Sequence, residues 1–230
     1  MAKILQIETA TQTCSVALAV DGKNIALKEE TAHNIHASSL TLFIQEVMQA
    51  ASLSFQDLDA VAVSKGPGSY TGLRIGVSTA KGLCYASDKP LIAVDTLAMM
   101  AHGFRKANPD YTGLVCPMID ARRMEVYTCL FDHQLKPIVP VTAKIIDGDS
   151  FSADLQDHKI AFIGDGALKC NEVLQGPNAD FSDQLFNSAA NMTVLAEAAY
   201  KAGKFEDVAY FEPYYLKDFM FTTPKKKAQK

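Results

Sequence analysis

The strongest chemical signal in this sequence is a glycine-rich turn between an apolar run and a helical pattern. Leu58 to Val63 is apolar enough for a buried strand, Gly66-Pro67-Gly68 interrupts it, and a helix is predicted from Gly72 to about Tyr85. A strand, a glycine-rich turn and a helix N-terminus can together bind a phosphate group. The glycine spacing is not that of a dinucleotide site and no Gly-Lys-Ser/Thr follows, so the nucleotide signal is weak.

The predicted helix carries a row of small residues that requires a close neighbour. Gly72, Gly76 and Ala80 recur every four residues, so they lie on one side of the helix, and Gly82 adds a third glycine. Each glycine inside a helix costs about 1 kcal/mol relative to alanine. We therefore expect another helix to pack closely against this row, with a bound phosphate as the alternative.

Side chains that could bind a metal ion are sparse. The polar loop after the first predicted strand contains Glu8 as its lone carboxylate, and Gln12 and Thr13 are neutral. A neutral pair provides no carboxylate ligand for a divalent ion. His33 and His36 have a spacing that can share a metal, but no third ligand is near, so a capping or solvated role is favoured.

A charged cluster occurs in the second half of the chain. Arg122 and Arg123 lie between Asp120 and Glu125, at a turn that joins two predicted strands. The cluster can bind an anion, although an internal salt-bridge network is the commoner role of such residues. Both alternatives stay open at this point.

The elements that must position these residues follow an α/β pattern. Three strands form an N-terminal meander, a helix follows, and further strands and helices alternate after the glycine-rich turn. The predicted strands are 3–8, 14–20, 24–28, 58–63, 90–94, 114–120 and 124–131, and 160–167 is a strand that ends in a Gly-Asp-Gly turn. Helices are predicted at 37–51, 72–85 and 190–202, with a boundary loop at 104–112.

The composition bounds the class of protein. With 48% hydrophobic and 21% charged residues among 230, the chain can bury a good core. The five cysteines form no CxxC pair, which argues against a disulfide framework or a zinc ribbon and fits a reducing cytoplasm. We expect a cytoplasmic protein without a signal peptide, because the apolar run in the first residues, MAKILQIET, is short and soon becomes polar. No apolar stretch reaches the length of a membrane span.

The charge is unevenly distributed along the chain. The net charge is −4, but the last ten residues contain four lysines and no acids. Because an acidic body repels a phosphate backbone, direct nucleic-acid binding by this chain alone is not expected. A short lysine-rich terminus is commonly a solvated end.

The segment 66–83, GPGSYTGLRIGVSTAKGL, resembles the signature of the bacterial TsaB (YeaZ) family. Asp120-Ala121-Arg122, Glu125-Val126-Tyr127 and Pro213-Tyr214-Tyr215-Leu216 resemble the second half of the same family. The resemblance implies a two-lobed α/β fold of the actin/hexokinase/Hsp70 (ASKHA) type with an abbreviated second lobe. The lobes are expected at 1–104 and 105–220, followed by a basic, disordered tail at 221–230.

The resemblance also implies a function. Proteins of this family are non-catalytic subunits required for threonylcarbamoyl-adenosine (t6A) modification of tRNA next to the anticodon. They pair with and activate TsaD, help to recruit the ATPase TsaE, form homodimers when alone, and meet tRNA only through the complex. No cofactor is expected in this chain, although ATP or ADP is possible at the partner interface. The residues expected to contact TsaD or a second copy are Leu40, Phe43, Ile44, Val47, Gly72, Leu73, Gly76, Val77 and Ala80.

One departure from the TsaD-like enzymes bears on catalysis. Their His-x-x-x-His metal motif falls on Thr96 and Met100 of this sequence, and neither residue is a hard-metal ligand. Two alternative functions stay open. An ATP-binding kinase or ATPase of the same superfamily is weakened by the neutral Gln12 and Thr13, and a metal-dependent glycoprotease-like peptidase is weakened by Thr96 and Met100.

Overall fold

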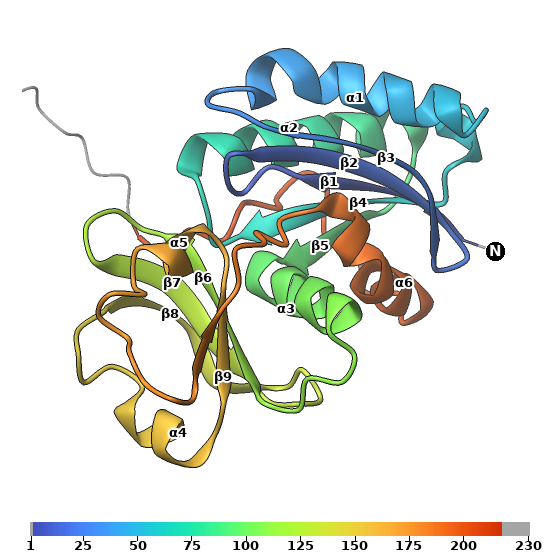
Figure 1. Cartoon of the computed structure of the whole chain (residues 1–230). Helices are drawn as coiled ribbons and strands as arrows, with labels where there is room; N and C mark the ends of the chain where they lie inside the picture. Colours follow the sequence, from blue (N-terminus) through green and yellow to red (C-terminus); the bar gives the residue numbers. More distant parts are fainter. Residues whose placement is uncertain (1, 218–230) are drawn as a thin grey trace, which may run out of the picture.

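The N-terminal part of the chain forms a five-stranded mixed sheet (Figure 1). The computed structural model describes residues 2–217. The strands are β1 (Lys3–Glu8), β2 (Thr13–Val20), β3 (Lys23–Thr31), β4 (Ala60–Gly66) and β5 (Leu91–Asp95). Their order is β3-β2-β1-β4-β5, with an antiparallel meander on one side and the parallel strands β1, β4 and β5 on the other. The predicted meander is confirmed.

A second five-stranded sheet repeats this topology. Its strands are β6 (Leu114–Asp120), β7 (Glu125–Phe131), β8 (Pro137–Ile145), β9 (Ile160–Ile163) and β10 (Ala179–Phe181). The order β10-β9-β6-β7-β8 is that of the first sheet read in the opposite direction, and β6 again pairs antiparallel with β7 and parallel with β9. The chain thus contains two βββαβαβ units, although its sequence shows no repeat of short period.

Helices cover both faces of the first sheet (Figure 1). On one face, α1 (His36–Ala50) and α2 (Tyr70–Ser87) pack against inward residues such as Leu5 and Val63, and the 3-10 turn η1 (Phe55–Asp57) lies between them in sequence. On the other face lie α3 (Thr96–Ala107) and α6 (Thr193–Lys201). The helices inserted between strands of the second sheet, α4 (Ser152–Asp157) and α5 (Asp165–Leu168), are short, in agreement with an abbreviated second lobe.

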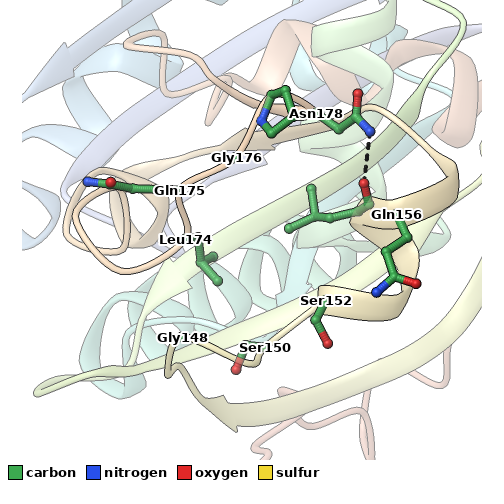
Figure 2. Close-up of a pocket in the computed structure, with 10 residues that line it drawn as sticks. Gly148, Ser150, Ser152, Gln156, Leu174, Gln175, Gly176 and Asn178 are labelled. Atoms are coloured by element: carbon green, nitrogen blue, oxygen red, sulfur yellow. Dashed lines mark hydrogen bonds between the residues drawn. The ribbon is translucent and has the colours of Figure 1, made fainter.

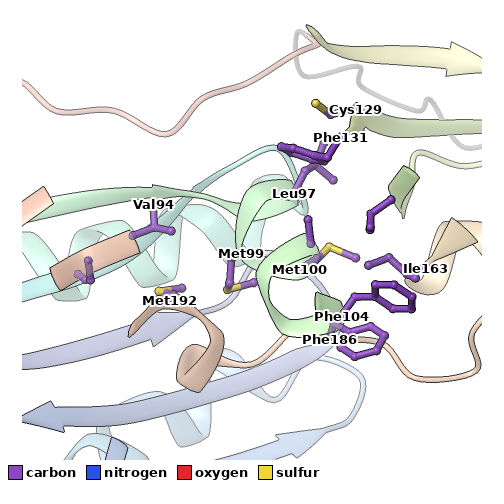
Figure 3. Packing of buried hydrophobic residues seen from close by; sticks show 14 of the residues in the cluster. Val94, Leu97, Met99, Met100, Phe104, Cys129, Phe131, Ile163, Phe186 and Met192 are labelled. Carbon is purple, nitrogen blue, oxygen red and sulfur yellow. The ribbon is translucent and has the colours of Figure 1, made fainter. Parts of the chain in front are cut away.

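Helix α3 joins the two sheets through one continuous core (Figure 3). Its side chains contact strand residues of the first sheet, such as Val94, and of the second sheet, such as Ile163. Asp95 caps the helix by accepting a hydrogen bond of 3.0 Å from the Ala98 amide. We had not predicted this helix, and its last turn occupies part of the expected boundary loop at 104–112. The apolar residues of α3 do recur with the helical period, more strongly than those of α1 or α2, so the sequence does contain the signal for this helix.

The C-terminal part of the chain returns to the first sheet. Here the 3-10 turn η2 (Ala189–Met192) precedes α6, and the Ala189 amide donates to Ser15 Oγ at 2.9 Å. Farther along, the Glu206 amide donates to the Leu91 carbonyl at 2.9 Å, and the Tyr214 amide to that of Lys65 at 2.7 Å. The segment expected to belong to the second lobe, residues 105–220, therefore contains a stretch whose contacts are with the first sheet. The predicted basic tail at 221–230 lies outside the described residues.

Among residues 2–217, no helix combines the length and the apolar character that crossing a membrane requires.

Candidate functional site

Three parallel strands end side by side where an α/β sheet commonly binds a ligand. Glu8 ends β1, Gly66 ends β4 and Asp95 ends β5, and the last two are register partners. The loop after β1, the glycine-rich turn after β4 and the N-terminus of α3 therefore meet at one edge. The sequence placed its first candidate residues at this edge.

The N-terminus of α2 is occupied by the chain itself. The Ser69 amide donates to the Ala10 carbonyl at 2.7 Å, and the Ser69 hydroxyl caps the helix by accepting from the Gly72 amide at 3.2 Å. A Cβ atom on Gly68 would overlap the Ala10 carbonyl oxygen. The loop between β1 and β2 thus packs directly against the glycine-rich turn and the N-terminus of α2.

The glycine row of α2 packs against the same loop. A Cβ atom on Gly72 would overlap the Thr9 carbonyl oxygen, and one on Gly76 would overlap the Thr9 hydroxyl. His36 supports the loop from α1, because its Nε2 lies 2.7 Å from the Thr11 carbonyl oxygen. Our expectation of another helix as the close neighbour is wrong for these two glycines. The capping or solvated role expected for His36 is also wrong, because this side chain is buried and anchors the loop.

All nine residues expected at a partner interface face the core of this chain. Leu40, Phe43, Ile44 and Val47 of α1 are at most 5% exposed, and Leu73, Val77 and Ala80 of α2 at most 3%. The two glycines among the nine are buried as well. A periodic apolar face indicates burial, and here the chain's own sheet provides it.

The outer face of the same two helices carries few charges: Arg74 of α2 and Glu46 of α1 are exposed, and Glu46 pairs with Lys28 of β3. Leu42 is 54% exposed on α1, and Tyr85 is 86% exposed on α2. Gly82 differs from Gly72 and Gly76, because a Cβ atom on it would meet no atom within 4 Å. Further exposed residues on this face are Thr41, Gln45, Gln49 and Ser78. Sequence periodicity did not single out this set, since few of its members are apolar.

Glu8 serves the loop rather than an open site. Its side chain is fully buried, and its Oε1 accepts a hydrogen bond of 2.5 Å from the Ala10 amide. Burial raises the pKa of Glu8 to about 7, although the hydrogen bonds from Ala10 and Ser64 lower it. A carboxyl group that is buried and keeps its proton up to the neutral range is a poor ligand for a divalent cation.

The two positions of the metal motif lie in the apolar core. Thr96 and Met100 are both fully buried in α3, and Met100 lies among residues such as Leu97 and Ile163 (Figure 3). The Met100 methyl group occupies the space that a Cβ atom on Gly164 would need. Within the described part of the chain, no three or more His, Cys, Asp or Glu residues are grouped so that they could hold a metal ion.

The two carboxylates of the turn between β6 and β7 form ion pairs with lysines, not with the neighbouring arginines. Lys169 pairs with Asp120 and Lys217 pairs with Glu125. Asp165, in the Gly-Asp-Gly turn after β9, accepts a hydrogen bond of 3.2 Å from the Asp120 amide. Burial and the nearby Asp120 charge raise the pKa of Asp165. Arg122 and Arg123 are exposed and, among residues 2–217, form no ion pair.

A pocket of about 200 Å³ lies at the opposite end of the second sheet (Figure 2). It lies before β9 and β10, near their amino ends, whereas the loops described above follow the carboxyl ends of the parallel strands. The Asn178 side chain donates to the Leu155 carbonyl at 2.8 Å across it. Its polar lining is uncharged, from Ser150, Ser152, Gln156, Gln175 and Asn178. The pocket is therefore separate from the candidate site.

Comparison with known proteins places these features in a family. Residues 23–218 match the family model described as TsaD, tRNA N6-adenosine threonylcarbamoyltransferase. The chain is 39% identical over 125 residues to the Escherichia coli tRNA threonylcarbamoyladenosine biosynthesis protein TsaB, a match that covers 54% of this chain and 53% of that protein. It is 27% identical over 227 residues to the Haemophilus influenzae protein of the same description, covering 94% and 93%. The match therefore spans about half the length of the first relative and nearly all of the second.

Solved structures support the same grouping. YeaZ from Pseudomonas aeruginosa superimposes with a TM-score of 0.83 at 25% identity, over 94% of this chain and all of that chain. The activator of 2-hydroxyisocaproyl-CoA dehydratase from Clostridium difficile superimposes with a TM-score of 0.52 at 9% identity, over 88% and 97%. The second likeness concerns the fold alone. Together with the two βββαβαβ units, it confirms the predicted ASKHA fold.

Proposed function

The chain belongs to the TsaD family and, within it, to the TsaB (YeaZ) proteins, and from this membership we propose that it is a non-catalytic subunit of the tRNA t6A modification system. In this proposal it pairs with TsaD, activates it, and helps to recruit the ATPase TsaE. TsaD then modifies the adenosine next to the anticodon, and the chain meets tRNA through the complex.

The observation that carries the non-catalytic role is that the ligand edge of the first sheet is filled. The Ala10 carbonyl oxygen occupies the N-terminus of α2, at 2.7 Å from the Ser69 amide. The two positions of the metal motif, Thr96 and Met100 of α3, are buried in the interior of the protein. Because protein atoms fill the positions at which a phosphate group or a metal ion would bind, this edge is suited to a structural role beside a partner and not to catalysis. The same packing argues against the kinase or ATPase and the peptidase alternatives.

The pairing surface that we propose is the outer face of α1 and α2. Its exposed residues Leu42, Ser78, Gly82 and Tyr85 are uncharged, which supports a protein contact because charged residues are depleted in the cores of such interfaces. Exposed Leu42 and Tyr85 provide apolar area, and open Gly82 lets another helix approach the backbone closely. We propose that a second copy uses this face when TsaD is absent, and that any ATP or ADP is held at the boundary with the partner.

A cytoplasmic location completes the proposal. All five cysteines are buried as free thiols, and burial raises the pKa of Cys84 to about 11, which makes that thiol unreactive at neutral pH. Unpaired cysteines of this kind fit a reducing compartment.

Reconstitution of the modification reaction tests the proposed function. The chain is mixed with tRNA, threonine, bicarbonate, ATP and the enzyme that forms threonylcarbamoyl-adenylate, with and without TsaD. We expect no modified nucleoside until TsaD is added, and far less product from TsaD without this chain. Modified nucleoside formed without TsaD contradicts the non-catalytic role. A TsaD activity that does not depend on this chain contradicts the partner role.

A further inference from the structure

The turn between β6 and β7 exposes two adjacent arginines on a fixed backbone. Arg122 and Arg123 have φ angles of 70° and 52°, which residues with a Cβ atom adopt uncommonly. The Arg122 amide donates to Asp120 Oδ1 at 2.7 Å, and the Glu125 amide donates to the Arg122 carbonyl at 3.3 Å. The backbone is therefore held from both sides, and both arginine residues are exposed on it.

The carboxylates beside these arginines are already neutralised by lysines. Lys169 pairs with Asp120, and Lys217 pairs with Glu125. The Lys169 ammonium group also donates to the Glu125 carbonyl at 2.7 Å. Because neither arginine has an ion-pair partner among residues 2–217, their charges are available to a ligand outside the chain. A salt-bridge network of the two arginines with these carboxylates, one of the two alternatives left open by the sequence, is therefore wrong.

Further contacts connect this turn with a cation on α2. Lys217 follows Tyr215, whose ring packs on Tyr70 with the ring centroids 4.6 Å apart. The guanidinium group of Arg74 lies 5.2 Å from the centroid of the Tyr70 ring, and Arg74 is exposed. The Tyr215–Tyr70 and Tyr70–Arg74 contacts, together with the backbone from Tyr215 to Lys217, thus connect the Lys217–Glu125 pair at this turn with an exposed arginine in the first lobe.

We propose that Arg122 and Arg123 bind the phosphate backbone of the tRNA when the chain is assembled with its partner. The inference rests on the proposed function, which supplies the RNA. A planar guanidinium group can donate two parallel hydrogen bonds to the oxygens of one phosphate, a geometry that an ammonium group does not offer. The net charge of −4 keeps RNA away from most of this chain, so a fixed and unneutralised cationic turn is a distinct feature of its surface.

Salt-dependent binding of an unmodified tRNA transcript to the complex of the full chain with TsaD tests this inference. The variant Arg122→Gln/Arg123→Gln removes both charges but keeps similar side-chain length. We expect affinity to fall by about tenfold or more at low salt, and the slope of log affinity against log salt to decrease by about two. Arg122→Lys/Arg123→Lys should recover part of the affinity. The matched control Lys106→Gln/Lys204→Gln removes two exposed lysines elsewhere and should bind like the wild type.

The possible outcomes separate this inference from the proposed function. Equal affinity and equal salt slope for wild type and the glutamine variant overturn the phosphate contact. A folded glutamine variant that no longer binds TsaD also overturns it, because the turn is then a protein contact. If wild-type chain does not support t6A formation with TsaD, the proposed function itself fails. Melting curves verify folding, and the single variants provide the same comparison if the double variant does not fold.

Discussion

Thr9 fills the space that a side chain on Gly76 would need, because a Cβ atom there would overlap the Thr9 hydroxyl. Gly72 stands in the same relation to the Thr9 carbonyl oxygen. The loop after β1 is therefore packed against α2, more than sixty residues later in the chain. This contact explains two helix glycines and also closes the edge at which a ligand would enter.

We expect Gly76→Ala to lower the free energy of unfolding. The new methyl group must displace Thr9, which we expect to cost about 1–3 kcal/mol, more than the gain of about 1 kcal/mol in helix propensity. Gly82→Ala is the matched control in the same helix, and it should stabilise the chain because nothing lies within 4 Å of the new atom. Urea unfolding of both variants provides the measurement. A Gly76→Ala protein as stable as the Gly82→Ala protein contradicts the close packing.

Glu8 should make stability depend on pH. Its pKa is about 7 in the folded chain, against an ordinary value of 4.5, so the unfolded chain loses this proton first as the pH rises. Stability should therefore be unaffected by Glu8 below pH 4.5, fall between pH 4.5 and 7, and then stay lower by about 3 kcal/mol.

Glu8→Gln removes the titration and tests this expectation. The free energy of unfolding of the variant, measured by urea titration from pH 4 to 8, should rise relative to wild type as the pH increases through the window. Glu172→Gln, at an exposed position, is the control and should follow the wild-type profile. Parallel profiles for wild type and Glu8→Gln between pH 4.5 and 7 refute the raised pKa.

Restoring the histidine motif in α3 should destabilise the chain and should not create a metal site. Thr96→His/Met100→His places two imidazole groups in the core between the sheets, at an expected loss of about 2–5 kcal/mol. Met100→Leu keeps the volume and should lose less than about 1.5 kcal/mol. Melting curves with and without zinc are the measurement. A double variant that folds and gains melting temperature with zinc would show that the position is open to a metal.

Much of the fold could be predicted from periodicity. The strands β1 and β6 begin and end where the sequence indicated, and α1 and α2 agree with prediction to within two residues at each end. The helices α1 and α2 each have one apolar face, so their period is visible, and β1 and β6 are short, largely apolar runs that are buried on both faces. Helix α3 was missed although its apolar residues recur with the helical period, because Thr96 and Met100 were interpreted only as positions of a metal motif. The return of the C-terminal segment to the first sheet left no local signal.

The site was harder to predict, because its close contacts join residues far apart in sequence. A row of small residues shows that something approaches the helix, but it does not say what approaches. Gly76 meets the loop at Thr9, whereas Gly82 is open, and the two glycines look alike in the sequence. Likewise the sequence offered Arg122 and Arg123 as possible cations for Asp120 and Glu125, whereas the fold brings in Lys169 and Lys217.

The C-terminal segment should contribute to stability although it contains little regular structure. Truncation after Glu206 removes the hydrogen bond of 2.7 Å from the Tyr214 amide to Lys65, and that of 2.9 Å from Lys81 Nζ to the Phe211 carbonyl. We expect a clear drop in melting temperature. Truncation after Phe221 is the control and removes four lysines that lie outside the described residues. We expect it to leave melting temperature and TsaD pairing intact, and a large loss there would show that the tail docks on the body.

The proposed interface makes its sharpest prediction at Gly82. Gly82→Leu improves helix propensity by roughly 1 kcal/mol and meets no neighbour within the chain, so the variant should fold and melt no lower than the wild type. If a partner helix approaches here, the leucine side chain holds it away, and both homodimer and TsaD complex should be lost.

Circular dichroism melting, light scattering and co-purification with TsaD measure the three properties of Gly82→Leu separately. Ala202→Leu adds the same side chain at an exposed position next to α6, on the other face of the sheet, and should pair normally. Gly76→Leu should instead lose folding itself, because Thr9 occupies the space. A folded Gly82→Leu protein that still dimerises and still binds TsaD removes the outer face of α1 and α2 from the interface.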